Sequence, residues 1–298
     1  LLLGKLPLFD SLLLAFGTAG TGGFSILNSG CASYSPYIQY LIAIFMILFG
    51  VNFNVYYFIL IKKFKDAIHY EELKYYLLFI GASVAMITYN IHSLFPTIEQ
   101  AFRHALFQVG TVITTTGYAS TDFNKWPEFS KFILVMLMFS GACAGSTGGG
   151  MKVSRLVIML KTVKKELLSY LHPRTVRKVK FNGRIVEHEV IRGINVYMIA
   201  YAFVLMFSVL IISIDNFDFT SNFTAVVATL NNIGPGLNIV GPTGNFSMYS
   251  NLSKIVMILD MLAGRLELFP MLLLINPYTW KEIKIRKNKK NKKEGHSI

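Results

Sequence analysis

The sequence has 298 residues, 53% of them hydrophobic, and its mean hydropathy of +0.49 exceeds that of ordinary soluble domains. We therefore interpret the chain as a polytopic membrane protein. The formal net charge of +13 could suggest a nucleic-acid partner. However, lysine and arginine gather in three places separated by base-poor stretches, as the positive-inside rule produces. This pattern argues against nucleic acid and predicts that the basic segments face the cytoplasm.

Taken in chain order, the apolar stretches repeat one unit: a membrane helix, a short helix, a Thr/Gly loop and a second membrane helix. The unit 1–72 lacks its first helix and has a pore loop over 8–25 and a helix over 37–62. The unit 73–189 has a helix over 73–95, a pore loop over 97–121, a broken helix over 127–162 and a cytoplasmic connection to 189. The unit 190–298 has a helix over 190–214, a pore loop over 218–237, a helix over 251–275 and a basic cytoplasmic tail. The predicted fold class is all-α.

The three loops all contain glycine and no carboxylate, and the first two also contain threonine: GTAGTGGFS at 17–25, TTTGYA at 114–119 and NNIGPG at 231–236. Irregular backbone survives at membrane depth only when it is buried in protein or lines a water-filled cavity. Glycine lets successive carbonyls turn towards one axis, where they and threonine hydroxyls can replace a cation's hydration shell. Because calcium and magnesium usually require carboxylates, potassium is the leading candidate ion and sodium the second.

A glycine-rich run, GACAGSTGGG at 141–150, interrupts the apolar span that begins at Phe132. Glycine costs about 1 kcal/mol per residue in a helix interior, so we expect the run to break the helix. It lacks the Gly-Lys-Ser/Thr signature of a phosphate loop, which argues against nucleotide binding there. Arg265 lies inside the last apolar span and must face the bundle interior or water. It is interpreted as a pore-facing charge or as half of a buried pair with Asp260 or Glu267.

Four motifs carry a resemblance to a known family: TGGFS at 21–25, AGSTGGGMK at 144–152, ATLNNIGPGL at 228–237 and GRLE at 264–267. They occur in the order typical of the Trk/Ktr/HKT superfamily of potassium transporters, and the chain especially resembles the bacterial TrkH-type potassium uptake subunit from about Asp10 to Trp280. The resemblance implies four such units around a pseudo-fourfold pore. On that mapping the chain holds the second to fourth units, and the first is expected upstream of Leu1.

The resemblance also implies site residues. A potassium-binding selectivity filter would comprise Thr21, Gly22, Gly23, Phe24, Thr115, Thr116, Gly117, Tyr118, Asn232, Ile233, Gly234 and Pro235. A gate loop below it would comprise Gly141, Cys143, Gly145, Ser146, Thr147, Gly148, Gly149 and Gly150. Arg265 would be a charge in the pore. The residues Thr18 to Gly20 leave the register of the first filter loop open by a few positions.

The resemblance further implies a multi-pass protein of the inner membrane with a cytoplasmic C-terminus. It implies a homodimer and a cytosolic nucleotide-binding regulatory subunit, with potassium as the transported ion and no cofactor. No nucleophile and base constellation is present, so the chain is predicted not to be an enzyme. The alternatives are a sodium-permeable or Na⁺/H⁺-coupled cation transporter of the same superfamily, and a polytopic membrane enzyme or sensor.

Overall fold

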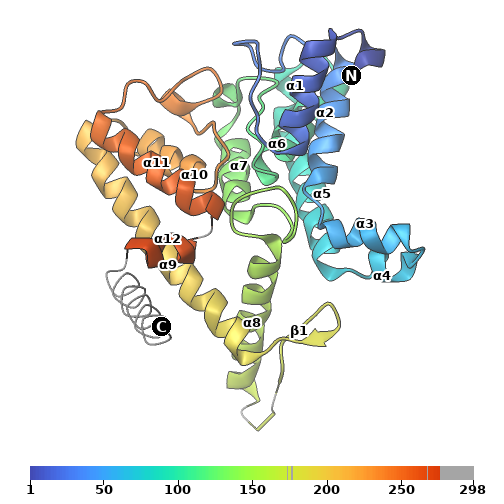
Figure 1. Ribbon diagram of the computed structural model, residues 1–298, viewed down its shortest axis with the longest axis vertical. Coiled ribbons are helices and arrows are strands. Elements are labelled where there is room, and N and C mark those ends of the chain that lie inside the picture. The colour runs from blue at the N-terminus through green and yellow to red at the C-terminus, as the bar shows by residue number, and fades with distance from the viewer. Residues whose placement is uncertain (173, 176, 267, 276–298) are drawn as a thin grey trace, which may run out of the picture.

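The computed structural model describes residues 1–172, 174–175, 177–266 and 268–275, and this part of the chain is mostly helical (Figure 1). Three short helices lead into the Thr/Gly loops: α1 (Leu8–Ala19), α6 (Ile98–Ile113) and α10 (Phe219–Leu230). The helices that flank them are α2 (Pro36–Phe49), α5 (Glu71–Ile91), α7 (Glu128–Ser140), α9 (His188–Ile212) and α11 (Asn251–Leu266). The prediction of an all-α fold is confirmed.

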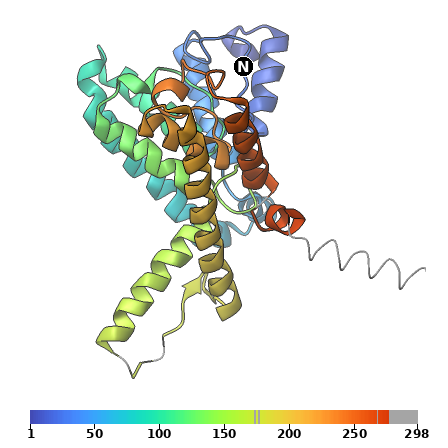
Figure 2. The same ribbon diagram turned by 90° about the vertical axis from the view of Figure 1, so that its left-hand side faces the viewer.

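The remaining elements connect or extend these helices. They are α3 (Phe53–Leu60), α4 (Phe64–Ile68), α8 (Val153–Leu171), α12 (Leu268–Ile275) and an antiparallel hairpin of β1 (Lys180–Phe181) and β2 (Arg184–Ile185). Short 3-10 turns lie at Leu2–Gly4, His92–Leu94, Phe123–Lys125, Ser213–Asp215 and Asn238–Val240. In Figure 2, α8 and the hairpin project together from the end of the helical body opposite the N-terminus.

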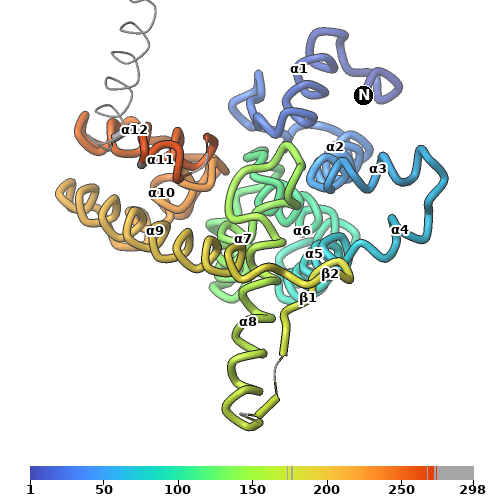
Figure 3. The backbone as a smooth tube through the Cα atoms, turned by 60° about the horizontal axis from the view of Figure 1, so that its bottom comes forward, coloured from blue at the N-terminus to red at the C-terminus, as the bar shows by residue number. Residues whose placement is uncertain are grey.

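The centre of the fold is the group α5, α6 and α7, with α1 and α2 on one side and α9, α10 and α11 on the other (Figure 3). Helix α6 packs against α2, α5 and α7, and its second half is buried from Phe107 to Ile113. Helices α6 and α2 lie close together at Gly110, where an added Cβ would make an ordinary contact with the side chain of Ile47 at 3.5 Å. A short helix buried on several sides is the arrangement expected of a re-entrant segment rather than a spanning one.

The predicted continuous helix over 37–62 is wrong. Helices α2 and α3 are bent by 89° at a break around Gly50. Gly50 lies against the Tyr76 side chain, and its carbonyl accepts a hydrogen bond from the Cys143 amide at 3.1 Å. The Asn52 side chain then caps the next helix by accepting from the amide of Asn54 at 2.9 Å. The apolar run therefore breaks because the glycine-rich segment docks there, which local hydrophobicity does not encode.

Two other predicted helices also differ in extent. The segment predicted as one helix over 251–275 contains α11 and α12, and residue 267 between them is outside the described residues. The second half of the broken helix, predicted to end at 162, continues to Leu171 as part of α8. This half is strongly amphipathic, with Lys161, Lys164 and Lys165 along it, so hydropathy alone stops too early.

Among the described residues, two helical stretches are long and apolar enough to cross a membrane, Glu71–Leu94 and His188–Asp215. The bent pair α2–α3 would make a third if it were one span. Helix α9 exposes Phe203, Met206, Phe207 and Leu210, each more than 60% accessible. A contiguous exposed apolar surface on a helix of spanning length is what contact with lipid requires.

Candidate ion pathway

The three Thr/Gly loops share one backbone turn. Each begins with a non-glycine residue in the left-handed region, Thr21, Thr115 and Asn232, with φ of 51°, 55° and 56°. Two residues later each has a glycine with positive φ, Gly23, Gly117 and Gly234, with φ of 69°, 92° and 106°. L-residues other than glycine enter this region at a cost, so three recurrences at matching positions indicate one motif. In this alignment of the turns, Thr21 of the first loop corresponds to Thr115 and Asn232, and α1 continues through Ala19.

Matching hydrogen bonds close the three turns. The amide after each left-handed residue donates to a carbonyl five residues earlier: Gly22 to Gly17 at 2.7 Å, Thr116 to Thr111 at 2.9 Å and Ile233 to Ala228 at 2.8 Å. The left-handed residue itself donates three residues back in each case, at 3.3, 3.1 and 3.0 Å. This pair of bonds is the Schellman ending of a helix. Each short helix thus ends at the loop, with the negative end of its dipole towards it.

Neighbouring loops interlock through their glycines. A Cβ at Gly23 would lie 1.8 Å from the Thr116 carbonyl oxygen, and one at Gly117 would lie 2.1 Å from the Ile233 carbonyl oxygen. Only glycine permits this approach, because real Cβ contacts under 3.0 Å essentially do not occur. The first loop therefore packs on the second, and the second on the third.

All three loops line one cavity of about 670 Å³. Its walls include residues from each loop: Thr21, Gly22, Gly23, Phe24, Thr116, Gly117, Asn232, Ile233 and Gly234. The last predicted filter residue of each loop differs in its surroundings. The side chain of Phe24 is 80% exposed and faces the cavity, whereas Tyr118 is buried at 1%. The structure thus brings nine of the twelve predicted filter residues to the cavity. Thr115, Tyr118 and Pro235 are not part of its lining, and Thr115 and Tyr118 are buried.

The glycine-rich segment (residues 141–150) forms turns between α7 and α8 and contacts all three loops. The Thr21 hydroxyl donates to the Thr147 carbonyl at 3.0 Å, and the Gly149 amide donates to the Thr115 hydroxyl at 2.6 Å. A Cβ on Gly149 would lie 2.9 Å from the Asn231 carbonyl oxygen. The segment therefore lies directly against the helix ends at which the loops begin, and its glycines are needed for this fit.

The other predicted gate residues shape the turns of the segment or contact its neighbours. Gly141, Gly145 and Gly150 all have positive φ, at 65°, 70° and 70°. Ser146 donates its hydroxyl to the Cys143 carbonyl at 2.6 Å, which closes the turn within the segment. A Cβ on Gly148 would lie 3.0 Å from the Thr114 carbonyl oxygen. On its far side the segment is joined to the α2–α3 break, where the Phe53 amide donates to the Gly145 carbonyl at 3.1 Å.

Arg265 faces the cavity and is exposed to it. Its guanidinium donates to the Gly20 carbonyl at 3.2 Å, which joins the end of α11 to the end of α1. Asp260, one of the two partners considered from the sequence, accepts instead from the Ser208 hydroxyl at 2.8 Å. The other, Glu267, lies outside the described residues. A positive charge thus borders the same cavity as the loops.

Sequence reasoning missed three residues at this site. Glu72 is 1% exposed and binds the glycine-rich segment. Asn231 is buried beside that segment and donates its amide to the Tyr201 hydroxyl at 2.8 Å. Lys254 lines the cavity and donates to the Ser247 carbonyl at 2.8 Å. The position of Glu72 at the start of a membrane helix was the available signal. It was a weak one, because acids are common in the first turns of helices and the partner, Ala144, is distant in the sequence.

The arrangement suits a weakly hydrated cation. Three helix dipoles present their negative ends at one cavity, together with backbone carbonyls and threonine hydroxyls. Within the described ranges, no group of three or more His, Cys, Asp or Glu side chains could hold a metal ion. The fold and the site define a helical membrane protein in which three short helices end at loops that border one cavity.

Comparison with known sequences identifies the family. The family model for TrkH, described as a cation transport protein, matches residues 73–280, and the chain belongs to this family. The predicted resemblance to the Trk superfamily is therefore confirmed. Because the family consists of cation transport proteins, the prediction that the chain is not an enzyme agrees with it.

Individual relatives support the same assignment. The chain is 33% identical over 283 residues to the Trk system potassium uptake protein TrkH of Salmonella typhimurium, covering 93% of this chain and 58% of that protein. It is 29% identical over 282 residues to the potassium uptake protein TrkG of Escherichia coli, covering 94% and 58% respectively. The crystal structure of the potassium transporter TrkH from Vibrio parahaemolyticus superposes with a TM-score of 0.83 and 31% identity, covering 91% of this chain and 59% of that one. The chain spans less than two thirds of these proteins.

Proposed function

We propose that the protein containing this chain takes up potassium by conducting it across a membrane along the three loops. One observation carries the proposal: the same positive-φ turn occurs at the ends of α1, α6 and α10, and all three turns border one cavity. The names of the relatives, potassium uptake proteins, support potassium as the ion. Sodium permeation or sodium and proton coupling remains the alternative within the family.

The proposed filter consists of the loop residues that the sequence resemblance implied. Carbonyl oxygens of cavity-lining residues such as Thr21, Thr116 and Asn232 replace the water around potassium as it enters. The negative ends of three helix dipoles lower the energy of the cation at the same place. Glycines two residues later hold neighbouring loops close enough for oxygens from different loops to reach one ion.

The glycine-rich segment is the proposed gate. In the structure it lies against the loops, and its attachments are hydrogen bonds to Thr21, Thr115 and the α2–α3 break. Opening would require these bonds to exchange while the glycines change backbone conformation. Arg265 adds a positive charge beside the cavity, which raises the energy of a passing cation when the pathway is closed.

We further propose an inner-membrane location with the basic segments and the C-terminus in the cytoplasm, a homodimer, and a cytosolic nucleotide-binding regulatory subunit. The charge pattern supports this orientation. Two of the basic regions also lie at one end of the fold, because Lys161 of α8 contacts Glu71 at the start of α5. A regulatory subunit would therefore meet both of these basic regions at that end of the fold.

The test uses the full-length protein reconstituted in liposomes and a bacterium lacking its own potassium uptake systems. We expect rescue of growth at low potassium and a potassium flux that exceeds the sodium flux. Equal fluxes of both ions would favour the sodium-permeable alternative. Failure to rescue growth or to carry either ion, despite membrane insertion, would contradict the proposal.

A further inference from the structure

Two adjacent acids at the start of α5 bind different neighbours. Glu72 is 1% exposed, and its Oε1 accepts the amide of Ala144 at 2.7 Å and the amide of Ser154 at 3.2 Å. Ala144 belongs to the glycine-rich segment, and Ser154 lies in the first turn of α8. One carboxylate oxygen therefore joins the segment to the helix that follows it and fixes both to α5.

Two features of this contact offset part of the cost of burying the carboxyl group of Glu72. The carboxylate lies at the N-terminus of α8, where unpaired amides and the helix dipole favour a negative charge. Hydrogen bonds from amides to a carboxylate are also stronger than neutral ones. Removal of the acceptor would leave two amides without a partner in a buried place, so Glu72 is suited to hold the segment in one position.

Glu71 binds the β1–β2 hairpin from the same helical turn. The Glu71 amide donates to the Asn182 side-chain oxygen at 2.8 Å, and the Asn182 amide donates to the Glu71 carboxylate at 3.0 Å. The hairpin tip, Asn182 and Gly183, has φ of 50° and 74°, the turn that an Asn-Gly pair favours. The tip thus caps the first amide of α5, and a reciprocal pair of bonds fixes the hairpin there.

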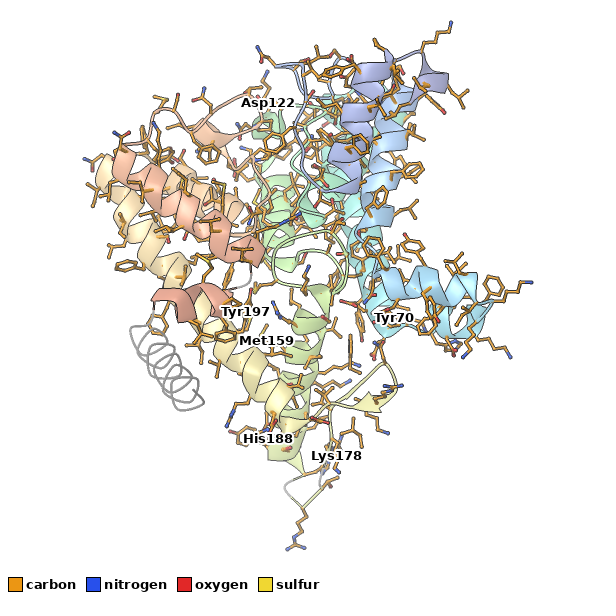
Figure 4. All side chains as sticks on the ribbon, in the orientation of Figure 1. Tyr70, Asp122, Met159, Lys178, His188 and Tyr197 are labelled. Atoms are coloured by element: carbon orange, nitrogen blue, oxygen red, sulfur yellow. The ribbon has the colours of Figure 1, made fainter. Side chains whose placement is uncertain are left out.

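Lys161 of α8 completes the connection. Its ammonium group pairs with the Glu71 carboxylate and donates to the Lys180 carbonyl in β1 at 2.9 Å. In Figure 4, Tyr70, which precedes α5, lies above the hairpin, and Lys178 marks the strand's approach from the end of α8. The hairpin, α8 and the glycine-rich segment therefore all meet at residues 71 and 72.

We propose that Glu72 is a positioning residue for the gate and that Glu71 couples the β1–β2 hairpin to it, so that displacement of the hairpin releases the glycine-rich segment. This inference rests on the proposed role of that segment as the gate. The hairpin lies at the end of the fold that carries the basic segments, so a protein bound there acts on the gate through one helical turn of α5. Neither acid needs to touch the permeating ion.

The experiment uses Cys143, which is fully buried in the glycine-rich segment, as a reporter. In the full-length protein with its other cysteines replaced, the rate of Cys143 modification by a membrane-permeant thiol reagent measures release of the segment. Glu72→Leu removes the acceptor, whereas Glu72→Gln retains the Oε1 that receives both bonds. We expect Glu72→Leu to raise the modification rate about tenfold, which corresponds to a decrease of about 1.4 kcal/mol in the free energy needed to release the segment. The rate in Glu72→Gln should stay within about twofold of the parent.

The coupling is tested at the hairpin tip. Asn182→Ala should raise Cys143 modification about threefold and increase basal potassium flux, whereas Arg184→Ala, an exposed position on the same hairpin, should change neither. If Glu72→Leu does not fold, the Cys143 modification rate in Asn182→Ala alone tests the inference. An unchanged rate in Asn182→Ala, or equal rates in Glu72→Leu and Glu72→Gln, overturns the inference even when potassium flux is normal. Absence of potassium flux in the parent protein contradicts the proposed function instead, and the Cys143 rates still test the connection.

Discussion

Replacement of Gly117 by alanine should disrupt the pathway without unfolding the protein. The added Cβ would lie 2.1 Å from the Ile233 carbonyl oxygen, where an ordinary contact begins at 3.4 Å, so that carbonyl must move by roughly 1.3 Å. The φ of 92° adds about 1–2 kcal/mol of backbone strain for a residue with a Cβ. Overpacking adds about 1–3 kcal/mol. The displaced oxygen belongs to the proposed filter, so potassium flux should fall at least about tenfold.

The assay compares Gly117→Ala with Gly81→Ala in the same unit of the full-length protein. At Gly81, no described atom lies within 4 Å of an added Cβ, so this variant should retain flux. Potassium flux is measured in liposomes, and thermal unfolding in detergent is measured alongside it to separate misfolding from local distortion. Normal flux in Gly117→Ala would refute the interlocking of the loops as a requirement for conduction.

Three further predictions concern Arg265 and two groups elsewhere in the fold. Arg265→Ala should raise potassium flux several-fold, with Arg265→Lys closer to the parent; unchanged flux in both variants would exclude its role. Burial raises the pKa of the Cys31 thiol to about 12, so iodoacetamide at pH 8 should modify it, as followed by mass spectrometry, only after unfolding. Hydrogen bonding by the Ser221 hydroxyl holds the pKa of Asp218 below its ordinary 3.8. The Asp218 carboxylate therefore stabilises the fold above pH 3.8, and this contribution is lost as the pH falls further. The melting temperature of Asp218→Asn should differ more from that of the parent at pH 7 than at pH 3. An equal difference at both pH values would contradict this.

The sequence could predict the short helices and the glycine turns because both depend on local features. Apolar runs too short to span, followed by Thr/Gly turns, identify α1, α6 and α10 without tertiary information. The order of the four motifs then indicates the Trk/Ktr/HKT superfamily. The residues at Thr21, Thr115 and Asn232 were chosen by resemblance, and the structure gives all three the same left-handed conformation.

Features that depend on distant contacts could not be predicted. The apolar run 38–61 contains local helix-boundary signals, Gly50 and the Asn52 cap, but not the 89° angle. At the bend the Cys143 amide donates a hydrogen bond to the Gly50 carbonyl, a contact between distant residues. The approach of Gly117 to the Ile233 carbonyl likewise joins residues from different units. From the sequence alone, Glu72 is indistinguishable from an ordinary acid in the first turn of a helix. Its role depends on the hydrogen bond from Ala144, which is distant in the sequence.

The central claim is that oxygens of the three loops bind the permeating ion together. The most direct measurement is anomalous diffraction from crystals of the full-length protein soaked in rubidium, a potassium substitute. The account predicts a peak in the cavity among the loops at Thr21, Thr116 and Asn232, and its loss in Gly117→Ala. A peak bound elsewhere, or one that is unchanged in that variant, would contradict it.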